Sequence, residues 1–445
     1  MAPNEGSDVT TQYSIGATQG HTYAHPSPIG QNSREDSFRS NQPDDLLCWL
    51  MSGTQDEPFI DNILAELCER LRAAAVPVAR ATLHFRTHNP QWLGARLLWR
   101  AGSSGVKVTT FGYGVEETPQ FLQSPAYDIY SGATMVRQRL DVGIDSAAQY
   151  PIYTELTREG LTDYVAWPLN HTLGKRHVVT FATDRSGGFL DDHIETLRYL
   201  LSAITLITEI RLKNILTRTL LDTYVGPRAG QEILAGATRR GSGKTVNAAV
   251  TICDLRDFTE FASRWPLDDV IERLNQYFDA ISEPIERFGG EILKFVGDGL
   301  LAIFPLSDPN ASQNLLAAVR EGHAAIAALN ATNSDGRRPP LRHGVGVHVG
   351  EVAYGNIGSK KRLDFTVIGP AVNVASRLEG MTKKLNKPIL LSGQFAKIVN
   401  CQDELDHIGS FNVRGLDNAL EVYSLVLGGR LDNVERFKKN HESGE

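Results

Sequence analysis

The segment 292–304, ILKFVGDGLLAIF, constrains the fold of this chain more than any other. Two apolar runs of strand length flank a turn in which glycines surround Asp298, and this pattern predicts a β-hairpin. Lys294 and Asp298 are charged positions within what would otherwise be core strands. Because burying an unpaired charge is costly, we expect each of them to meet an ion or a ligand.

A second carboxylate stands in a similar setting. Asp254 follows the apolar run AAVTIC, and the segment FTEFASRW after it begins a helix, whose first N–H groups suit an anion. If this strand pairs with the hairpin, Asp254 and Asp298 meet at one sheet edge and suit Mg²⁺ that holds a phosphate. Taken alone, each aspartate also fits a plain structural role, Asp254 as a helix N-cap and Asp298 as a turn residue.

The length of 445 residues allows two or three domains, and the patterns divide the chain into five parts. Residues 1–43 are rich in polar residues, Gly and Pro, and predict a disordered tail. Residues 44–189 mix helix and strand patterns, 190–224 predict one long helix, and 431–445 a flexible tail. Residues 225–430 alternate strands and helices and predict an α+β domain, an antiparallel sheet covered by helices.

Composition narrows the functional classes. The net charge of −7 gives no basic footprint for nucleic acid. The amino terminus does not have the pattern of a signal peptide, and the longest apolar run is too short for a membrane span, so we expect a cytoplasmic protein. The four cysteines are scattered without metal-ligand spacing, which argues against a zinc site or a disulfide framework.

The first half of the chain has the order of a known sensor domain. Over about residues 55–210, a helix, strands, a variable middle, further strands and a long exit helix follow one another, which resembles a GAF domain. In the exit helix, Ile194, Leu197, Leu201 and Ile204 form an apolar stripe. We expect this stripe to pair with the same helix of a second chain and to transmit a signal from an unidentified ligand.

Four motifs follow one another over about residues 224–427: CDLRDFTEFA, FGGEILKFVGDGLLAIF, GVGVHVGEVAYGNIGS and LDFTVIGPAVNVASRLE. In these motifs and in their order, the second half of the chain resembles the catalytic domain of class III adenylate and guanylate cyclases. The resemblance implies a ferredoxin-like antiparallel sheet with helices, a homodimer, ATP as substrate, and two Mg²⁺ ions per site with Mn²⁺ as a substitute. From this resemblance we expect an adenylate cyclase that forms 3′,5′-cyclic AMP and pyrophosphate.

The resemblance assigns metal and phosphate roles by position. Asp254 and Asp298 match the two metal-binding aspartates, and Leu255 would offer a backbone carbonyl to one ion. Phe258 and Thr259 stand where backbone amides hold the triphosphate.

The remaining roles concern the base, the ribose and the reacting phosphate. Lys294 and Thr366 match the pair that reads the purine. Asn373 and Arg377 match the residues near the ribose and the reacting phosphate, and their spacing puts both on one helix face. Arg414 matches a basic residue that contacts the terminal phosphates. In the family, the metal aspartates of one subunit complete a site with the base-reading and transition-state residues of the other.

Two positions depart from the common pattern. Asp257 stands where the family usually has glycine, and we expect its carboxylate to repel the triphosphate, although aspartate tolerates unusual backbone angles. Thr366 stands where many members have aspartate and resembles a subclass often stimulated by bicarbonate. Its hydroxyl can accept from adenine or donate to guanine, whereas Lys294 favours adenine.

Two alternatives stay open at this point. The chain could be a regulatory protein with a degenerate cyclase domain, for which Asp257 is the one supporting feature. Four retained residues argue against this alternative: Asp254, Asp298, Asn373 and Arg377. The chain could also be a guanylate cyclase, which a competition between ATP and GTP separates from the first reading.

Overall fold

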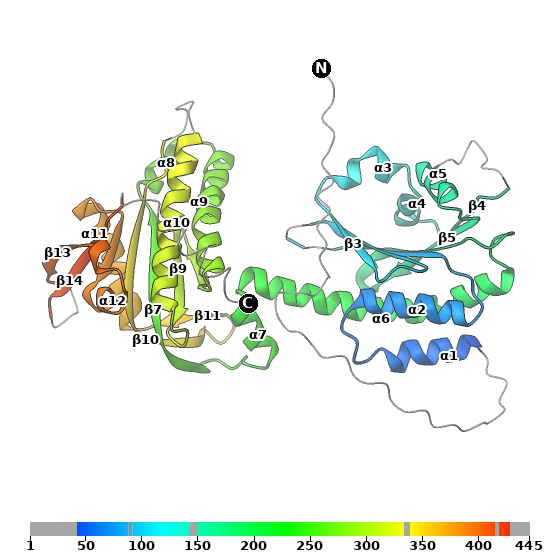
Figure 1. Ribbon diagram of the computed structural model, residues 1–445, viewed down its shortest axis with the longest axis horizontal. Coiled ribbons are helices and arrows are strands. Elements are labelled where there is room, and N and C mark those ends of the chain that lie inside the picture. The colour runs from blue at the N-terminus through cyan, green and yellow to red at the C-terminus, as the bar shows by residue number, and fades with distance from the viewer. Residues whose placement is uncertain are drawn as a thin grey trace, which may run out of the picture. The chain divides into compact units, whose positions relative to one another are not determined.

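The structure is a computed structural model that describes residues 42–87, 89–90, 92–142, 150–332, 339–413 and 418–427. The chain divides into two compact units, Met1–Leu220 and Leu221–Glu445, called here the N-terminal and C-terminal units (Figure 1). The predicted tails 1–43 and 431–445 lie outside the described residues, except for residues 42 and 43, and so does Arg414.

The N-terminal unit is built on one six-stranded antiparallel sheet in the order β3-β2-β1-β6-β5-β4. Its strands are β1 Arg80–Arg86, β2 Gly94–Arg100, β3 Lys107–Phe111, β4 Val136–Arg139, β5 Asp163–Asn170 and β6 Arg176–Thr183. Its helices are α1 Gln42–Cys48, a π-helical turn η1 Trp49–Gly53, α2 Ile60–Ala73, α3 Pro119–Leu122, α4 Pro125–Ser131, α5 Pro151–Arg158 and α6 Asp191–Tyr224.

Side-chain alternation along the strands fills two apolar layers, one on each face of this sheet. On β6, Val179 and Phe181 pack toward α1, α2 and α6, whereas Val178 and Ala182 pack toward α4 and α5. Figure 1 shows the same separation, with α1, α2 and α6 on one side of the strands and α3, α4 and α5 on the other. The unit is therefore a three-layer α+β fold.

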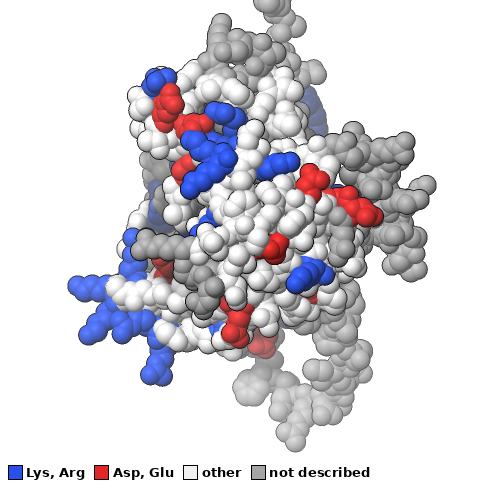
Figure 2. All heavy atoms as spheres, turned by 90° about the vertical axis from the view of Figure 1, so that its left-hand side faces the viewer, with Lys and Arg blue, Asp and Glu red and all other residues white. Residues whose placement is uncertain are grey.

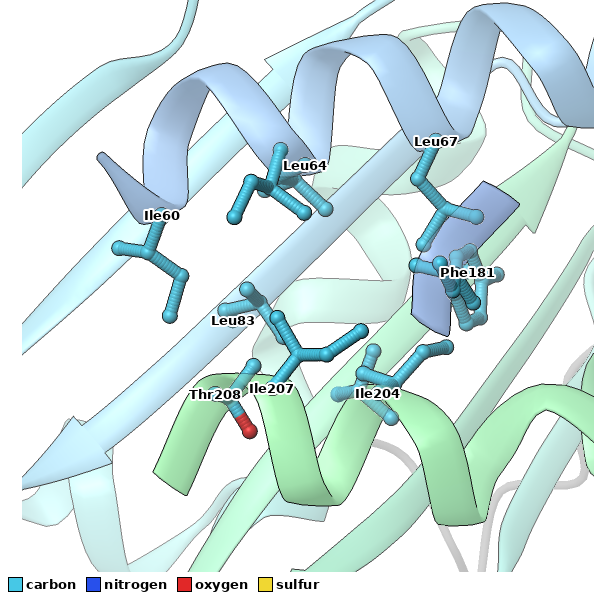
Figure 3. A pocket seen from close by; sticks show the side chains of 11 residues that line it. Ile60, Leu64, Leu67, Leu83, Phe181, Ile204, Ile207 and Thr208 are labelled. Atoms are coloured by element: carbon cyan, nitrogen blue, oxygen red, sulfur yellow. The ribbon is translucent and has the colours of Figure 1, made fainter. Parts of the chain in front are cut away.

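A small apolar cavity lies between α2, α6 and the sheet (Figure 3). Ile60, Leu64 and Leu67 reach it from α2, and Ile204 and Ile207 reach it from α6. Its volume of about 20 Å³ leaves room for roughly one water molecule. This cavity is therefore a packing defect in the apolar core and is too small for a cofactor.

The long helix α6 corrects one prediction. The stripe that we expected to pair with a second chain is used within the unit: Ile194, Leu197 and Ile204 are buried against the sheet, and Leu201 packs beside them. A period of 3.6 residues identifies an apolar face but not what covers it. A different set on α6, Tyr199, Leu206 and Ile210, is the exposed apolar stripe, with 45–48% of each residue accessible.

The C-terminal unit contains an eight-stranded sheet in which β13-β14-β12-β10-β7-β9-β8 follow one another and β11 pairs with β10. All pairs are antiparallel except β10 with β12, which is parallel, so the predicted antiparallel sheet has one parallel pair. Its strands are β7 Gly243–Leu255, β8 Glu291–Val296, β9 Gly299–Pro305, β10 His343–Gly358, β11 Leu363–Ile368, β12 Ile389–Ser392, β13 Leu405–Phe411 and β14 Leu420–Leu425.

Helices cover both faces of this sheet. They are α7 Pro227–Leu234, α8 Phe258–Arg264, α9 Leu267–Arg287, α10 Ala311–Thr332, α11 Pro370–Leu385 and α12 Gly393–Ile398. Tyr277 of α9 and Leu315 of α10 share one core with Cys253 of β7. Ala229 of α7 and Ala375 of α11 belong to the core on the opposite face.

Glycines let α11 lie directly on β10. A Cβ on Gly346 would stand 2.1 Å from the carbonyl oxygen of Ala375 and 2.4 Å from the amide nitrogen of Glu379. A Cβ on Gly344 would stand 2.3 Å from the hydroxyl of Thr382. The motif GVGVHVG therefore places glycines under the helix and valines in the core on the other face.

Two features of the described residues concern membranes and nucleic acids. No helix among the described residues is long and apolar enough to cross a membrane. On the face of the molecule that Figure 2 shows, acidic and basic side chains are interspersed, apart from one basic group at the lower left. No continuous basic surface covers the described part of that face.

Candidate active site

The two predicted metal-binding aspartates meet at the end of the central strands. Asp254, near the end of β7, is paired with Gly299 of β9 and Gly344 of β10. Asp298 occupies the turn between β8 and β9 and directly precedes Gly299, the residue that pairs with Asp254. The predicted hairpin is confirmed, and it brings both carboxylates to one edge of the sheet.

Glu379 of α11 is a third carboxylate that affects the charge of Asp254. The pKa of Asp254 is raised to about 7 by burial and by the negative charges of Asp298 and Glu379. The pKa of Glu379 is raised by burial and by Asp298, while Arg256 opposes the rise. Three carboxylates opposed by one guanidinium keep a net negative charge here, which favours a bound cation or a bound proton.

The donor chemistry of this edge fits a divalent cation. Carboxylate oxygens are the hard ligands that Mg²⁺ and Mn²⁺ prefer, and Leu255 could add a backbone carbonyl. Gly299 leaves space beside the carboxylates of Asp254 and Asp298. A Cβ at this position would crowd the site, because it would lie 3.1 Å from Oδ1 of Asp254. Among the described residues, no group of three or more His, Cys, Asp or Glu side chains is placed to hold a metal ion, so other ligands would come from the substrate, water or backbone.

The turn after β7 contains the backbone amides that we predict to bind phosphate. Asp257 is the N-cap of α8, and Phe258 and Thr259 are the first two residues of that helix. Amides in the first turn of a helix have no partner within the helix and point outward. Asp257 adopts a left-handed backbone conformation, with φ 62° and ψ 21°.

The carboxylate of Asp257 is paired rather than free. Oδ2 accepts from Nη2 of Arg342 at 2.6 Å, and Oδ1 accepts from Nζ of Lys383 at 2.8 Å. These contacts, with that of Lys383 the larger, lower the pKa of Asp257. Its negative charge is therefore balanced within the chain, and the expected repulsion of a triphosphate is reduced.

The two predicted base-reading residues lie on strands that touch. Lys294 is half-buried on β8, and Thr366 is buried on β11, which contacts β8. The hydroxyl of Thr366 is buried and has no hydrogen-bond partner among the described residues. A buried polar group without a hydrogen-bond partner lowers stability, so this hydroxyl is suited to form a hydrogen bond with a ligand.

Asn373 and Arg377 lie on a different side of α11 from the sheet. Ala371, Ala375 and Glu379 form the face toward the sheet, whereas Asn373 is exposed and Arg377 is partly exposed. Positions two residues from a buried position on a helix point away from its partner surface. One chain therefore does not gather these two side chains with Asp254 and Asp298.

Sequence reasoning missed three residues of this region. Helical spacing could have indicated Glu379, because it stands four residues after Ala375 on the sheet-facing side of α11. Arg342 and Lys383 had none, since each meets Asp257 through tertiary packing from a distant part of the sequence.

The same part of the chain is similar to known proteins. Residues 242–427 match the model of the family described as "Adenylate and Guanylate cyclase catalytic domain". This region belongs to that family. The match includes all the described site residues named above.

Several proteins are similar to the cyclase region. Adenylate cyclase 1 of Rhizobium meliloti is 32% identical over 177 residues, which cover 39% of this chain and 26% of the relative. The adenylate cyclase of Anabaena cylindrica is 32% identical over 200 residues, which cover 42% of this chain and 38% of the relative. The chain thus spans well under half the length of either. The crystal structure of the guanylyl cyclase Cya2 is 26% identical, with a TM-score of 0.38 over 43% of this chain and 97% of that one.

Proposed function

We propose that the chain is an adenylate cyclase that converts ATP to 3′,5′-cyclic AMP and pyrophosphate. The observation that carries this proposal is the strand register that brings Asp254 and Asp298 to one sheet edge, just before the first turn of α8, inside a region of the cyclase family. Both relatives named above are adenylate cyclases, which favours ATP over GTP.

The residues of the chain then have defined tasks. Asp254 and Asp298, with the carbonyl of Leu255, would hold two Mg²⁺ or Mn²⁺ ions, which supply Lewis-acid charge at the 3′-hydroxyl and the phosphates. The amides of Phe258 and Thr259 would receive phosphate oxygens. The ammonium group of Lys294 and the hydroxyl of Thr366 would bind the edge of the adenine ring.

Asn373 and Arg377 would act in the site of a second copy. Asn373 would orient the ribose, and the guanidinium of Arg377 would stabilise negative charge on the reacting phosphate. Arg414, outside the described residues, would contact the terminal phosphates. Two equivalent sites in a homodimer would follow from two-fold symmetry.

An exposed apolar surface near the metal edge supports the homodimer. Phe295 and Val296, just before the turn that carries Asp298, are 51% and 61% exposed, and Leu267 and Ile271 of α9 are 71% and 48% exposed. The ring of Phe295 rests on that of Phe278, with centroids 4.4 Å apart. Exposed large apolar side chains next to a site are typical of an interaction surface, and a second copy is the partner that would complete this site.

The N-terminal unit would regulate the cyclase as a GAF-like sensor in a cytoplasmic protein. Its support is the element order, in which α2, the strands, the shorter middle helices and the exit helix α6 follow one another around one sheet.

The function is tested by measuring cyclic AMP and cyclic GMP formed by the purified protein with Mn²⁺, from ATP and GTP alone and in competition. We expect cyclic AMP as the main product. Asp298→Ala should lower turnover at least about a hundredfold, because charge stabilisation by one carboxylate is lost. Thermal unfolding shows whether this variant is folded, and normal turnover by a folded Asp298→Ala protein contradicts the metal assignment.

A further inference from the structure

We infer that Asp257 is a positioning residue, whose carboxylate ties the phosphate-binding turn to two other elements and holds it in its binding conformation. This inference rests on the proposed function, because the turn is important only if the amides of Phe258 and Thr259 receive phosphate. It goes beyond the family pattern, in which glycine is usual at this position. The residues that carry it are Asp257, Arg342 and Lys383.

The ties come from both sides of the turn. Arg342 directly precedes β10, and Lys383 lies in the last turn of α11, so Asp257 joins the β7–α8 turn to a strand and to a helix. The preceding residue adds two further links. The amide of Arg256 donates to the carbonyl of Arg342 at 2.8 Å, and its guanidinium donates to the carbonyl of Lys387 at 2.9 Å.

The carboxylate is available for this task because it does not cap the helix. The backbone carbonyl of Asp257 accepts from the amide of Phe261 at 3.1 Å, but its side chain makes no capping hydrogen bond. At φ 62° glycine is favoured, and aspartate and asparagine are tolerated better than most residues. Aspartate therefore keeps the backbone conformation that glycine would give and adds a charge that two cations hold.

Asp257 could affect nucleotide binding in two opposite ways, and the direction of the change in KM distinguishes them. If its charge mainly repels the triphosphate, removing the charge lowers KM for the nucleotide. If its ion pairs mainly keep the turn in place, removing them raises KM, because the amides must then be ordered during binding. The observed pairing with Arg342 and Lys383 favours the second effect.

The test uses full-length protein and the variants Asp257→Gly and Asp257→Asn, both compatible with the left-handed backbone. We expect KM for the metal-bound nucleotide to rise roughly two- to tenfold with a smaller change in kcat. The salt dependence of KM should also be weaker in both variants, since screening weakens the wild-type ties. Glu260→Gln is the matched control. It removes one carboxylate from the same helix, where Glu260 pairs with the nearby Arg264 at 2.9 Å, and it should leave KM almost unchanged.

Hydrogen–deuterium exchange without nucleotide gives a readout that does not depend on catalysis. Peptides over residues 254–266 should exchange faster in Asp257→Gly, Asp257→Asn and the double variant Arg342→Gln/Lys383→Gln than in wild type or Glu260→Gln. A lower KM in the Asp257 variants, unchanged exchange, or faster exchange with unchanged KM overturns the inference. If wild-type protein forms no cyclic nucleotide, the proposed function fails, while the exchange data still decide whether the tie exists.

Discussion

At the scale of single residues, the hydroxyl of Thr366 is the most informative polar group of the candidate base site. It is buried in a residue only 4% exposed and has no partner among the described residues, so a ligand that supplies one gains a hydrogen bond without displacing a protein contact. Its strand lies against the strand of Lys294. An ammonium group can donate to N1 of adenine while a hydroxyl accepts from its amino group, whereas guanine has an N–H donor at N1 and a carbonyl acceptor in place of that amino group.

Reversing this chemistry should change the preferred base. We expect Lys294→Glu combined with Thr366→Cys to shift the ratio of kcat/KM for ATP and GTP at least about tenfold toward GTP, because a carboxylate accepts from the N1–H and amino groups of guanine. Lys361→Glu, on the exposed turn before β11, is the control for a charge change alone. An active double variant that keeps its preference for ATP would show that these two residues do not read the base.

At the scale of elements, α6 has two faces with different partners. Ile194, Leu197 and Ile204 are used in the core of the N-terminal unit, whereas Leu206 and Ile210 are exposed. The exposed pair borders a groove of about 220 Å³, lined also by Met51, Thr54 and Arg211 among others. Leu206 and Ile210 stand four residues apart, and Tyr199 stands seven before Leu206, which is the spacing of a coiled-coil seam. We therefore expect the same stripe of a second copy to cover this one.

A change of helical phase in α6 should change activity. Inserting one residue after Asn214, beyond the last residue of α6 in the core of the N-terminal unit, rotates the downstream part of the helix by about 100°. We expect cyclic AMP production to change severalfold, and an insertion of seven residues, which nearly restores the phase, to return it close to the wild-type rate. Equal rates for insertions of one to seven residues would mean that α6 transmits nothing.

Local features of the fold were predictable from the sequence, whereas long-range contacts were not. The hairpin of β8 and β9 was predictable because alternation and a glycine turn are local signals, and the same holds for the length of α6. The partner of the apolar stripe on α6 was predicted wrongly, because periodicity does not say which surface covers a face. The contacts of Asp257 were beyond prediction, since 85 residues separate it from Arg342.

At the scale of the whole molecule, the proposed active site depends on a second copy of the chain. Asp254 and Asp298 lie at the sheet edge, and Asn373 lies on the side of α11 that faces away from the sheet. A site that needs all three is incomplete in one chain. The exposed apolar side chains of Phe295 and Val296 would provide surface for the second copy beside the proposed metal edge.

Mixing two inactive variants tests this claim most directly. Asp254→Ala and Asn373→Ala should each be nearly inactive alone, because every site in either homodimer has one defect. In a mixed dimer one site has both defects and the other has none. With random exchange half of the dimers are mixed, so cyclic AMP production should recover to about a quarter of the wild-type rate. No recovery, with mixed dimers confirmed by tagged pull-down and active wild-type protein in parallel, would show that each chain builds its own complete site.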